Sequence, residues 1–359
     1  MSQELTVVGV MSGTSLDGVD VCCVRFFSSG NTFNFEWIAA ETFDYSLPWK
    51  KDLQQAFHLD QQALNELNVK YGRYLGELIA DFLRKYKLDQ VDLIGSHGHT
   101  IFHQPDQGIT LQIGDGKEIC KKTQIKTVSD FRSLDVRLGG QGAPLVPIGD
   151  QLLFSDYEAC LNLGGIANIS FDKKGSRIAF DICPCNLPLN KIAQEVFGTD
   201  YDRGGEVAKS GRVNNDLLTQ LNQLPYYQQS FPKSLGVEWL NENFYPLLDK
   251  KDLKPEDLLR TIVEHETDQI SEILNVFSIK NCLITGGGAL NTFFMEKLKE
   301  KTTSKIEQPD TRLIHFKEAL IFAFLAYLRV QNKINTLASV TGASRDSTGG
   351  VLHVLENEI

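Results

Sequence analysis

Apolar and polar positions alternate in two separated parts of the chain, and each part predicts a set of short strands. In the first part, Leu5–Val10 and Val19–Phe27 are β-branched and apolar, and the small residues between them predict a hairpin. The second part predicts three strands, with Gly164-Gly165 and Asp172–Gly175 as turns: Ala159–Leu163, Ile166–Phe171 and Arg177–Ile182. The strand pattern therefore occurs twice.

Apolar residues recur with the helical period in four longer segments, namely Gln61–Lys87, Glu256–Phe277, Leu290–Lys301 and Glu318–Gln331. Strand meanders followed by helices and further strands predict an α/β protein with two similar lobes. The glycine-rich stretch 138–144 is typical of a crossing or hinge between them. We expect residues 1–135 plus about 330–359 in the first lobe and residues 136–329 in the second.

Length and composition fit two lobes around small ligands. The chain has 359 residues, which is more than one hydrophobic core usually supports, and it is 42% hydrophobic and 23% charged. Its net charge of −10 and the lack of a basic stripe argue against nucleic acid as a partner. The apolar stretch 319–328 is too short to span a membrane, no signal-type segment is present, and the seven cysteines are scattered, so we expect a cytoplasmic protein with reduced thiols.

The first hairpin is a candidate phosphate-binding loop. It lacks the lysine of a P-loop and leads into a strand, but small residues let backbone N–H groups approach an anion, and the hydroxyls of Ser12, Thr14 and Ser15 add donors. The alternative is a plain surface hairpin. The candidate nucleotide-binding residues in this segment are Ser12, Gly13, Thr14, Ser15, Leu16, Asp17, Gly18, Val19 and Asp20.

Two further glycine clusters extend the candidate phosphate site. Gly164-Gly165 lies between strands of the second lobe, where a second small hairpin facing the first across a cleft would grip a polyphosphate. Gly286, Gly287 and Gly288 follow a predicted strand and precede a helix, which permits close backbone approach at a helix N-terminus. The last pattern is common and is weak by itself.

The motifs, taken together and in order, resemble those of the anhydro-N-acetylmuramic acid kinase family. The matching stretches cover nearly the whole chain: "GVMSGTSLDGVD", "IGSHGHTIFHQP", "TLQIGDG", "SDFRSLDVRLGGQGAPLVP", "LNLGGIANISF", "ITGGGALN" and "SVTGAS". The resemblance implies two actin-like (ribonuclease H-like) lobes with an ATP cleft between them. It also implies ATP-dependent opening of the 1,6-anhydro ring of anhydro-N-acetylmuramic acid and phosphorylation of O6, and a homodimer.

The resemblance also implies roles for individual residues. Asp181 is the implied catalytic base for the attacking water, although the residue type alone equally suits a turn cap. His97, Asp130, Arg132 and Glu318 are implied around the sugar, with Arg132 on the lactyl carboxylate; the alternatives are a surface ion pair for Arg132 and an exposed helix position for Glu318. Asp17 and Asp20 are candidate Mg²⁺ neighbours, acting through water.

The segment "FDICPCN", residues 180–186, departs from the usual Phe-Asp-Thr-Gly-Pro-Gly-Asn of the family. Cys183 and Cys185 stand where glycine is common, so a backbone that needs positive φ there would be strained. Their spacing does not match a redox or zinc motif, and we expect buried small apolar groups. The histidines of "HGHTIFH" and the "EHETDQ" segment lack the further ligands of a zinc site.

Two functions of different class remain at this point. The first is the anhydro-sugar kinase. The second is a nucleotide-driven binding switch of the actin or Hsp70 type, in which ATP binds but no small molecule is phosphorylated. The residues that the resemblance assigns to the sugar favour the kinase.

Overall fold

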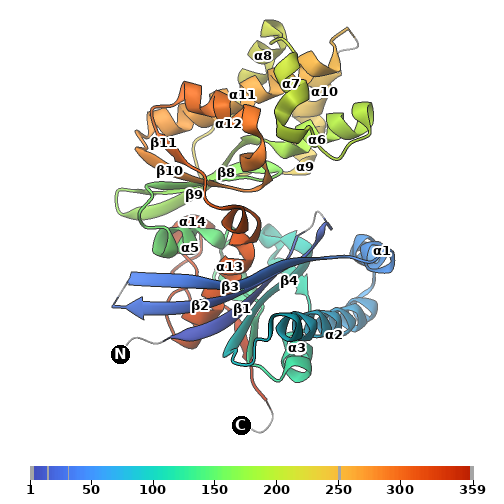
Figure 1. The fold of residues 1–359 in the computed structure, drawn as a ribbon, viewed down its shortest axis with the longest axis vertical. Coiled ribbons are helices and arrows are strands. Elements are labelled where there is room, and N and C mark those ends of the chain that lie inside the picture. Colours follow the sequence, from blue (N-terminus) through green and yellow to red (C-terminus); the bar gives the residue numbers. More distant parts are fainter. Residues whose placement is uncertain (1–3, 14–15, 31, 250–251, 356–359) are drawn as a thin grey trace. The chain divides into compact units, whose positions relative to one another are not determined.

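The computed structural model describes residues 4–13, 16–30, 32–249 and 252–355, and it divides into two compact units. Unit 1 contains residues 1–153 and 316–359, and unit 2 contains residues 154–315 (Figure 1). The division differs from the expected boundaries, because 136–153 and 316–329 lie with unit 1. Contacts far apart in sequence explain this: Lys317 pairs with Asp150 at 2.7 Å, and Gly149 packs against Ile321.

Unit 1 is built on a seven-stranded sheet. Along the sheet the order is β12-β6-β4-β1-β2-β3, with β5 paired to β4. The β1-β2-β3 meander is antiparallel, whereas β4 runs parallel to β1 and β6 runs parallel to β4. The strands are β1 (Leu5–Ser12), β2 (Gly18–Ser29), β3 (Thr32–Asp44), β4 (Leu93–Gln104), β5 (Ile109–Ile113), β6 (Thr127–Ser129) and β12 (Val351–His353).

Helices cover both faces of this sheet. Helix α2 (Gln61–Tyr86) begins at Asp60, whose side chain accepts a hydrogen bond from the Ala63 N–H, and its apolar stripe packs with Val8 and Val10 of β1. Successive residues of a strand point to opposite faces, so Gly9 lies on the other face, where the absence of a side chain lets α13 (Thr311–Val330) approach closely at Ala319.

Helix α13 begins seven residues before the predicted start at Glu318, and its first residues belong to unit 2. The other helices of unit 1 are α1 (Leu47–Gln55), α3 (Gly116–Thr123), α4 (Ser133–Arg137), α5 (Val146–Leu153) and α14 (Ala338–Thr341).

Unit 2 repeats the strand arrangement of unit 1 with five strands. Its order is β11-β10-β7-β8-β9, with an antiparallel β7-β8-β9 meander and with β10 and β11 added in parallel. The strands are β7 (Ala159–Leu163), β8 (Ile166–Lys173), β9 (Ser176–Pro184), β10 (Asn281–Thr285) and β11 (Lys305–Glu307). The two predicted meanders and the repeated α/β organisation are therefore confirmed.

One apolar core of unit 2 joins this sheet to the long helices. Ile262, Val263 and Ile270 of α11 (Pro255–Val276) pack with the apolar residues of the strands, and so does α12 (Thr292–Lys301). The other helices are α6 (Asn186–Ile192), α7 (Glu206–Ser210), α8 (Asn215–Asn222), α9 (Val237–Trp239) and α10 (Tyr245–Leu248). In the described ranges, every helix is too short or too polar to cross a lipid bilayer.

Candidate active site

Ser12 is the last residue of β1. Its side chain is 1% exposed, and its Oγ lies 2.6 Å from the Tyr45 hydroxyl and 2.8 Å from His99 Nδ1. Tyr45 is in turn 2.5 Å from the Tyr71 hydroxyl. The Ser12 hydroxyl is thus engaged inside unit 1, in a chain of buried hydroxyls that no local sequence pattern predicts.

The far side of the first hairpin carries two carboxylates. Leu16 has a φ of 60°, Asp17 is exposed, and Gly18 begins β2 with Phe43 so close that a side chain would not fit. Val19 is buried, and the Asp20 carboxylate accepts a 2.6 Å hydrogen bond from the Thr42 hydroxyl. Thr14 and Ser15, which were predicted to bind phosphate, lie outside the described residues.

In unit 1, the buried His97 pairs with the half-buried Arg132. Arg132 donates from Nε and Nη2 to His97 Nε2 at 3.0 and 2.9 Å, so His97 is neutral and its Nδ1–H donates to the Gly98 carbonyl at 3.0 Å. Burial and the neighbouring guanidinium hold the His97 pKa well below its usual value. Burial also lowers the Arg132 pKa to about 10, opposed by the Glu318 carboxylate.

The loop at Gly142 holds the third nitrogen of the Arg132 guanidinium. Arg132 Nη1 donates to the Gly142 carbonyl at 2.7 Å, and the Gly142 N–H donates to Asp135 at 2.8 Å. Asp135, which is 1% exposed, also accepts from the Thr341 hydroxyl in the "SVTGAS" stretch at 2.8 Å. Asp135 and Thr341 were absent from the sequence-based candidates, and they hold the loop that orients the guanidinium.

Asp130 lies two residues before Arg132 in the chain, and Glu318 interacts with Arg132 electrostatically from a distant part of the sequence. Asp130 has a φ of 53°, a value that non-glycine residues adopt rarely, and its Oδ1 accepts from the Ser133 N–H at the start of α4 at 3.2 Å. Glu318 lies on α13, is exposed, and acts electrostatically on Arg132. Unit 1 therefore brings together His97, Arg132 and Glu318, a cation flanked by a neutral imidazole acceptor and a carboxylate.

In unit 2, Gly164-Gly165 forms the turn between β7 and β8. The Gly164 carbonyl accepts from the Asn186 N–H and side chain at 3.1 and 2.8 Å, and the Gly165 carbonyl accepts from the Cys185 N–H at 2.9 Å. The C=O and N–H of a trans peptide point in opposite directions, so the N–H groups of Gly165 and Ile166 point away from α6. This orientation suits them to an anionic ligand.

The three glycines after β10 are not equivalent. Gly286 has a φ of 84°, and a side chain there would collide with Asn162 and Leu163; Gly288 is also packed against Leu163. At Gly287, by contrast, an added Cβ atom would lie 4.0 Å from its nearest neighbour, the Asn186 side-chain nitrogen. Gly286 and Gly288 serve packing, and Gly287 is the position at which a ligand has room to approach the backbone.

Asp181 lies on β9, the edge strand of the unit 2 sheet. The register with β8 shifts here, since Asn168 pairs with Asp181 and Ala167 pairs with Cys183, which leaves Ile182 as the extra residue of a bulge. The carboxylate is half-buried and its Oδ2 accepts from the Leu235 N–H at 2.8 Å. Burial raises its pKa to about 6, although the Leu235 N–H opposes the shift.

The cysteines after Asp181 do not occupy glycine-like backbone positions. Among the described residues with positive φ, neither Cys183 nor Cys185 occurs, and Cys185 has a φ of −139°. Both are fully buried in the apolar core of unit 2, as expected for small apolar groups. Asn186, the last residue of the motif, donates to the Leu163 carbonyl at 2.8 Å and ties β9 to the glycine turn.

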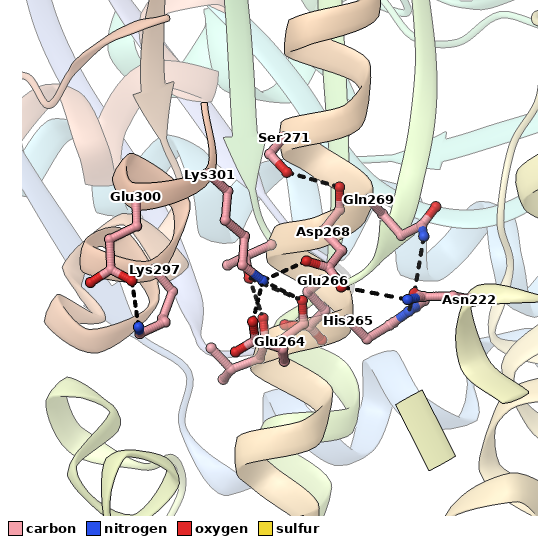
Figure 2. A network of polar contacts seen from close by, with 12 residues as sticks. Asn222, Glu264, His265, Glu266, Asp268, Gln269, Ser271, Lys297, Glu300 and Lys301 are labelled. Atoms are coloured by element: carbon pink, nitrogen blue, oxygen red, sulfur yellow. Dashed lines mark hydrogen bonds and ion pairs between the residues drawn. The ribbon is translucent and has the colours of Figure 1, made fainter. Parts of the chain in front are cut away.

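A polar network joins α11 to α12 and to Asn222 at the end of α8 (Figure 2). Lys301 reaches Glu264 at 2.7 Å and Asp268 at 2.6 Å, and His265 Nδ1 lies 2.6 Å from the Asn222 side chain. Burial lowers the His265 pKa to about 3, so this histidine is neutral. In the part of the chain that the structure describes, three or more His, Cys, Asp or Glu side chains nowhere gather as a metal site.

Comparison with known proteins decides which class of active site these residues form. A family model for anhydro-N-acetylmuramic acid kinase matches residues 5–354. The chain belongs to the anhydro-N-acetylmuramic acid kinase family. The family is one of phosphotransferases, so the kinase interpretation holds and the binding switch is not favoured.

Individual relatives match this chain in sequence over nearly their whole length. The anhydro-N-acetylmuramic acid kinase of Bacillus thuringiensis subsp. konkukian is 35% identical over 94% of this chain and 96% of its own. That of Hydrogenovibrio crunogenus is 36% identical over 96% of this chain and 97% of its own. Among solved structures, (R)-2-hydroxyglutaryl-CoA dehydratase component A of Acidaminococcus fermentans superposes with a TM-score of 0.44 at 13% identity. The superposition covers 91% of this chain and 99% of that chain, and a similarity this low carries no conclusion about the substrate.

Proposed function

We propose that this member of the family uses ATP and water to convert 1,6-anhydro-N-acetylmuramic acid to N-acetylmuramic acid 6-phosphate, with Asp181 as the general base. The observation that carries the assignment of the base is the state of the Asp181 carboxylate. It is half-buried at a bulge, and its pKa of about 6 suits a base that works near neutral pH. The family membership supports the substrate and the phosphoryl transfer.

The proposed reaction makes and breaks one bond at each of two centres. Water adds to the anomeric carbon as Asp181 takes its proton, the bond from that carbon to O6 breaks, and O6 attacks the γ-phosphorus. ADP leaves, and the proton held by Asp181 later passes to solvent. Since Oδ2 already accepts from Leu235, Oδ1 is the oxygen that takes the proton.

Arg132 is the proposed partner of the lactyl carboxylate. Its Nε, Nη1 and Nη2 all donate to His97 or Gly142, which fixes the plane of the guanidinium before substrate arrives. His97 holds Arg132 in that plane, and Asp130 and Glu318 are proposed to contact the sugar hydroxyls. A guanidinium with a preset plane offers a carboxylate two parallel hydrogen bonds.

The proposed phosphate contacts come from backbone groups in both units. In unit 1 they are the residues of the 12–20 segment, in which Ser12 supports the loop through its bonds to Tyr45 and His99. In unit 2 they are the N–H groups at Gly164-Gly165 and the open backbone at Gly287 within Gly286–Gly288. The carboxylates of Asp17 and Asp20 suit Mg²⁺, which prefers oxygen ligands and would neutralise charge on the phosphates.

The proposal also covers the cellular location, the oligomeric state and the partners of the protein. The all-buried, free cysteines and the use of ATP support a cytoplasmic enzyme. The resemblance to the family supports a homodimer, and the net charge of −10 supports a small-molecule partner without nucleic acid. Light scattering of the purified chain tests the oligomeric state.

A product assay tests the proposed function directly. The chain is incubated with 1,6-anhydro-N-acetylmuramic acid and Mg-ATP, and the sugar is analysed by mass spectrometry. We expect the mass of the sugar to rise by one water plus one phosphoryl group. ATP consumption without any sugar product would overturn the proposal and favour the alternative, a nucleotide-driven binding switch.

A further inference from the structure

The segment from Pro225 to Leu235 meets Asp181 at three separate points. The Tyr226 hydroxyl donates to the Asp181 carbonyl at 2.6 Å, the Asp181 N–H donates to the Lys233 carbonyl at 3.1 Å, and the Leu235 N–H donates to Asp181 Oδ2 at 2.8 Å. All three partners lie 45 or more residues away in sequence. One short segment thus satisfies the backbone N–H, the backbone C=O and one carboxylate oxygen of the same residue.

The position of Asp181 in the sheet explains why this segment is needed. An edge strand has unpaired backbone groups on its outer side, and a bulge interrupts its pairing with the inner neighbour as well. Asp181 lies on edge strand β9 at the bulge, so the sheet by itself fixes this residue poorly. Segment 225–235 covers the open edge at that residue.

The segment is itself held at its two ends. Lys233 Nζ donates to the Tyr226 carbonyl at 3.2 Å and lies 4.5 Å from the centre of the Tyr226 ring, which joins the two ends of the segment to each other. Between them, the Phe231 ring stacks on Phe180, the residue before Asp181, with ring centres 5.3 Å apart. The Tyr226 ring is buried, at 2% exposure.

We infer that segment 225–235 is a positioning clamp for the catalytic carboxylate, with Tyr226 as its positioning residue and the Leu235 N–H as the group that selects which carboxylate oxygen acts as the base. This rests on the proposed role of Asp181. A donor fixed on Oδ2 stabilises the ionised carboxylate and directs Oδ1 toward the proton that it accepts. The clamp thereby sets both the direction and the basicity of Asp181.

Tyr226→Phe removes the hydroxyl and retains the ring. We expect kcat to fall by about three- to tenfold, as for the loss of one hydrogen bond, with little change in KM for either substrate. We also expect the acidic limb of the pH profile of kcat/KM to move to higher pH, because a looser Leu235 N–H stabilises the carboxylate less. Incorporation of 4-aminophenylalanine at 226 restores a donor, and we expect it to restore both values.

Tyr227→Phe is the matched control. The neighbouring tyrosine is half-buried, and its hydroxyl lies 2.8 Å from His265 Nε2 instead of bonding to Asp181. Both variants lose one hydroxyl contact, so we expect similar losses of thermal stability, but an altered pH profile only in Tyr226→Phe. Equal pH profiles and equal kcat in the two variants would overturn the clamp.

A second measurement uses the unaltered chain, so that it stands even if Tyr226→Phe does not fold. With ¹⁵N-leucine labelling, the amide proton of Leu235 is followed from pH 5 to pH 8 and assigned by its loss in Leu235→Ile. We expect its chemical shift to titrate with a midpoint near 6, the value to which burial raises the Asp181 pKa, and to lose that titration in Asp181→Asn.

The two measurements separate the clamp from the proposed function. A Leu235 amide that does not titrate, in a chain that Asp181→Asn inactivates, would overturn the clamp and leave Asp181 as the base. Full activity of Asp181→Asn would overturn the catalytic role, whatever the Leu235 amide does.

Discussion

At the scale of single residues, Asp181 combines partial burial with one fixed hydrogen-bond donor. A base acts in its ionised form, and burial raises the Asp181 pKa to about 6. We therefore expect kcat/KM to be full above this pH and to fall as the pH drops through about 6. The acidic limb of the pH profile, measured with the sugar below saturation, checks this directly.

Asp181→Asn retains the shape and the acceptor oxygen but not the base. We expect turnover to fall by about 10²–10⁴-fold while the binding of ATP and sugar stays measurable by calorimetry. Asp172→Asn, on the adjacent strand β8, is a control with an exposed carboxylate. Turnover in Asp181→Asn close to that of the control would remove Asp181 from the mechanism.

Arg132 belongs to substrate binding in the same account. Arg132→Ala takes away a guanidinium that is fixed by His97 and Gly142, so we expect binding of the muramyl substrate to weaken by about 2–5 kcal/mol with ATP binding retained. Arg137→Ala is the matched control, because Arg137 is an exposed arginine at the end of the short helix α4, which begins directly after Arg132. A loss confined to ATP affinity would place Arg132 in the nucleotide site instead.

The sequence predicted which residues belong to the candidate site, but it did not predict which other groups orient them. The motifs pointed to Asp181, Arg132 and His97, but the groups that orient them come from elsewhere in the chain. Tyr226 is 45 residues from Asp181, and Thr341 is 206 residues from Asp135. Such contacts depend on the folded path of the chain and carry no local period or spacing.

At the scale of elements, helix α11 carries a buried acid that the proposed chemistry does not use. Glu266 is fully buried beneath Cys183 and Cys185, and neither of its carboxylate oxygens has a hydrogen-bond partner among the described residues. Burial raises its pKa well above the ordinary value of 4.5. Glu266 is therefore a neutral acid in the folded chain and an ionised one in the unfolded chain at neutral pH.

This difference predicts how stability depends on pH. Above pH 4.5 the unfolded state loses the proton that the folded state keeps, so the free energy of unfolding falls as pH rises, by up to about 1.4 kcal/mol per pH unit from this group. We expect Glu266→Gln to remove that fall and to be more stable than the parent chain at pH 7 to 8. Urea unfolding across pH measures it.

Glu272→Gln is the control for this series, because Glu272 lies exposed on the same helix. We expect it to retain the pH dependence of the parent chain. If Glu266→Gln and Glu272→Gln show the same slope of unfolding free energy against pH, the buried acid is not neutral in the folded state.

Among the elements, those with strong local patterns were predicted best. Helix α2 follows the predicted 61–87 segment because its apolar stripe, its Asp60 cap and its left-handed Lys87 all lie in the local sequence. The start of α13 was placed at Glu318 instead of Thr311, since residues 311–317 carry the helix from one unit into the other. The irregular 225–235 segment has no period and was not predicted as a part of the site.

At the scale of the whole molecule, the repeated strand order was predictable and the boundaries of the units were not. The order β3-β2-β1-β4-β6 of unit 1 matches β9-β8-β7-β10-β11 of unit 2, as the two predicted meanders implied. The boundaries instead depend on buried long-range contacts, such as Lys317 with Asp150. Glycine-rich composition at 138–144 marked a loop that orients Arg132 rather than the boundary itself.

We propose that one chain couples ring opening by water to phosphoryl transfer, and the fate of the water oxygen tests this coupling most directly. The substrate has no free 6-hydroxyl, so O6 must leave the anomeric carbon before or as it meets the γ-phosphorus. The reaction is run with Mg-ATP in ¹⁸O-water and analysed promptly, before anomeric exchange. We expect ¹⁸O at C1 of the sugar product and none in its phosphate; ¹⁸O in free inorganic phosphate with the anhydro-sugar unchanged would contradict the account.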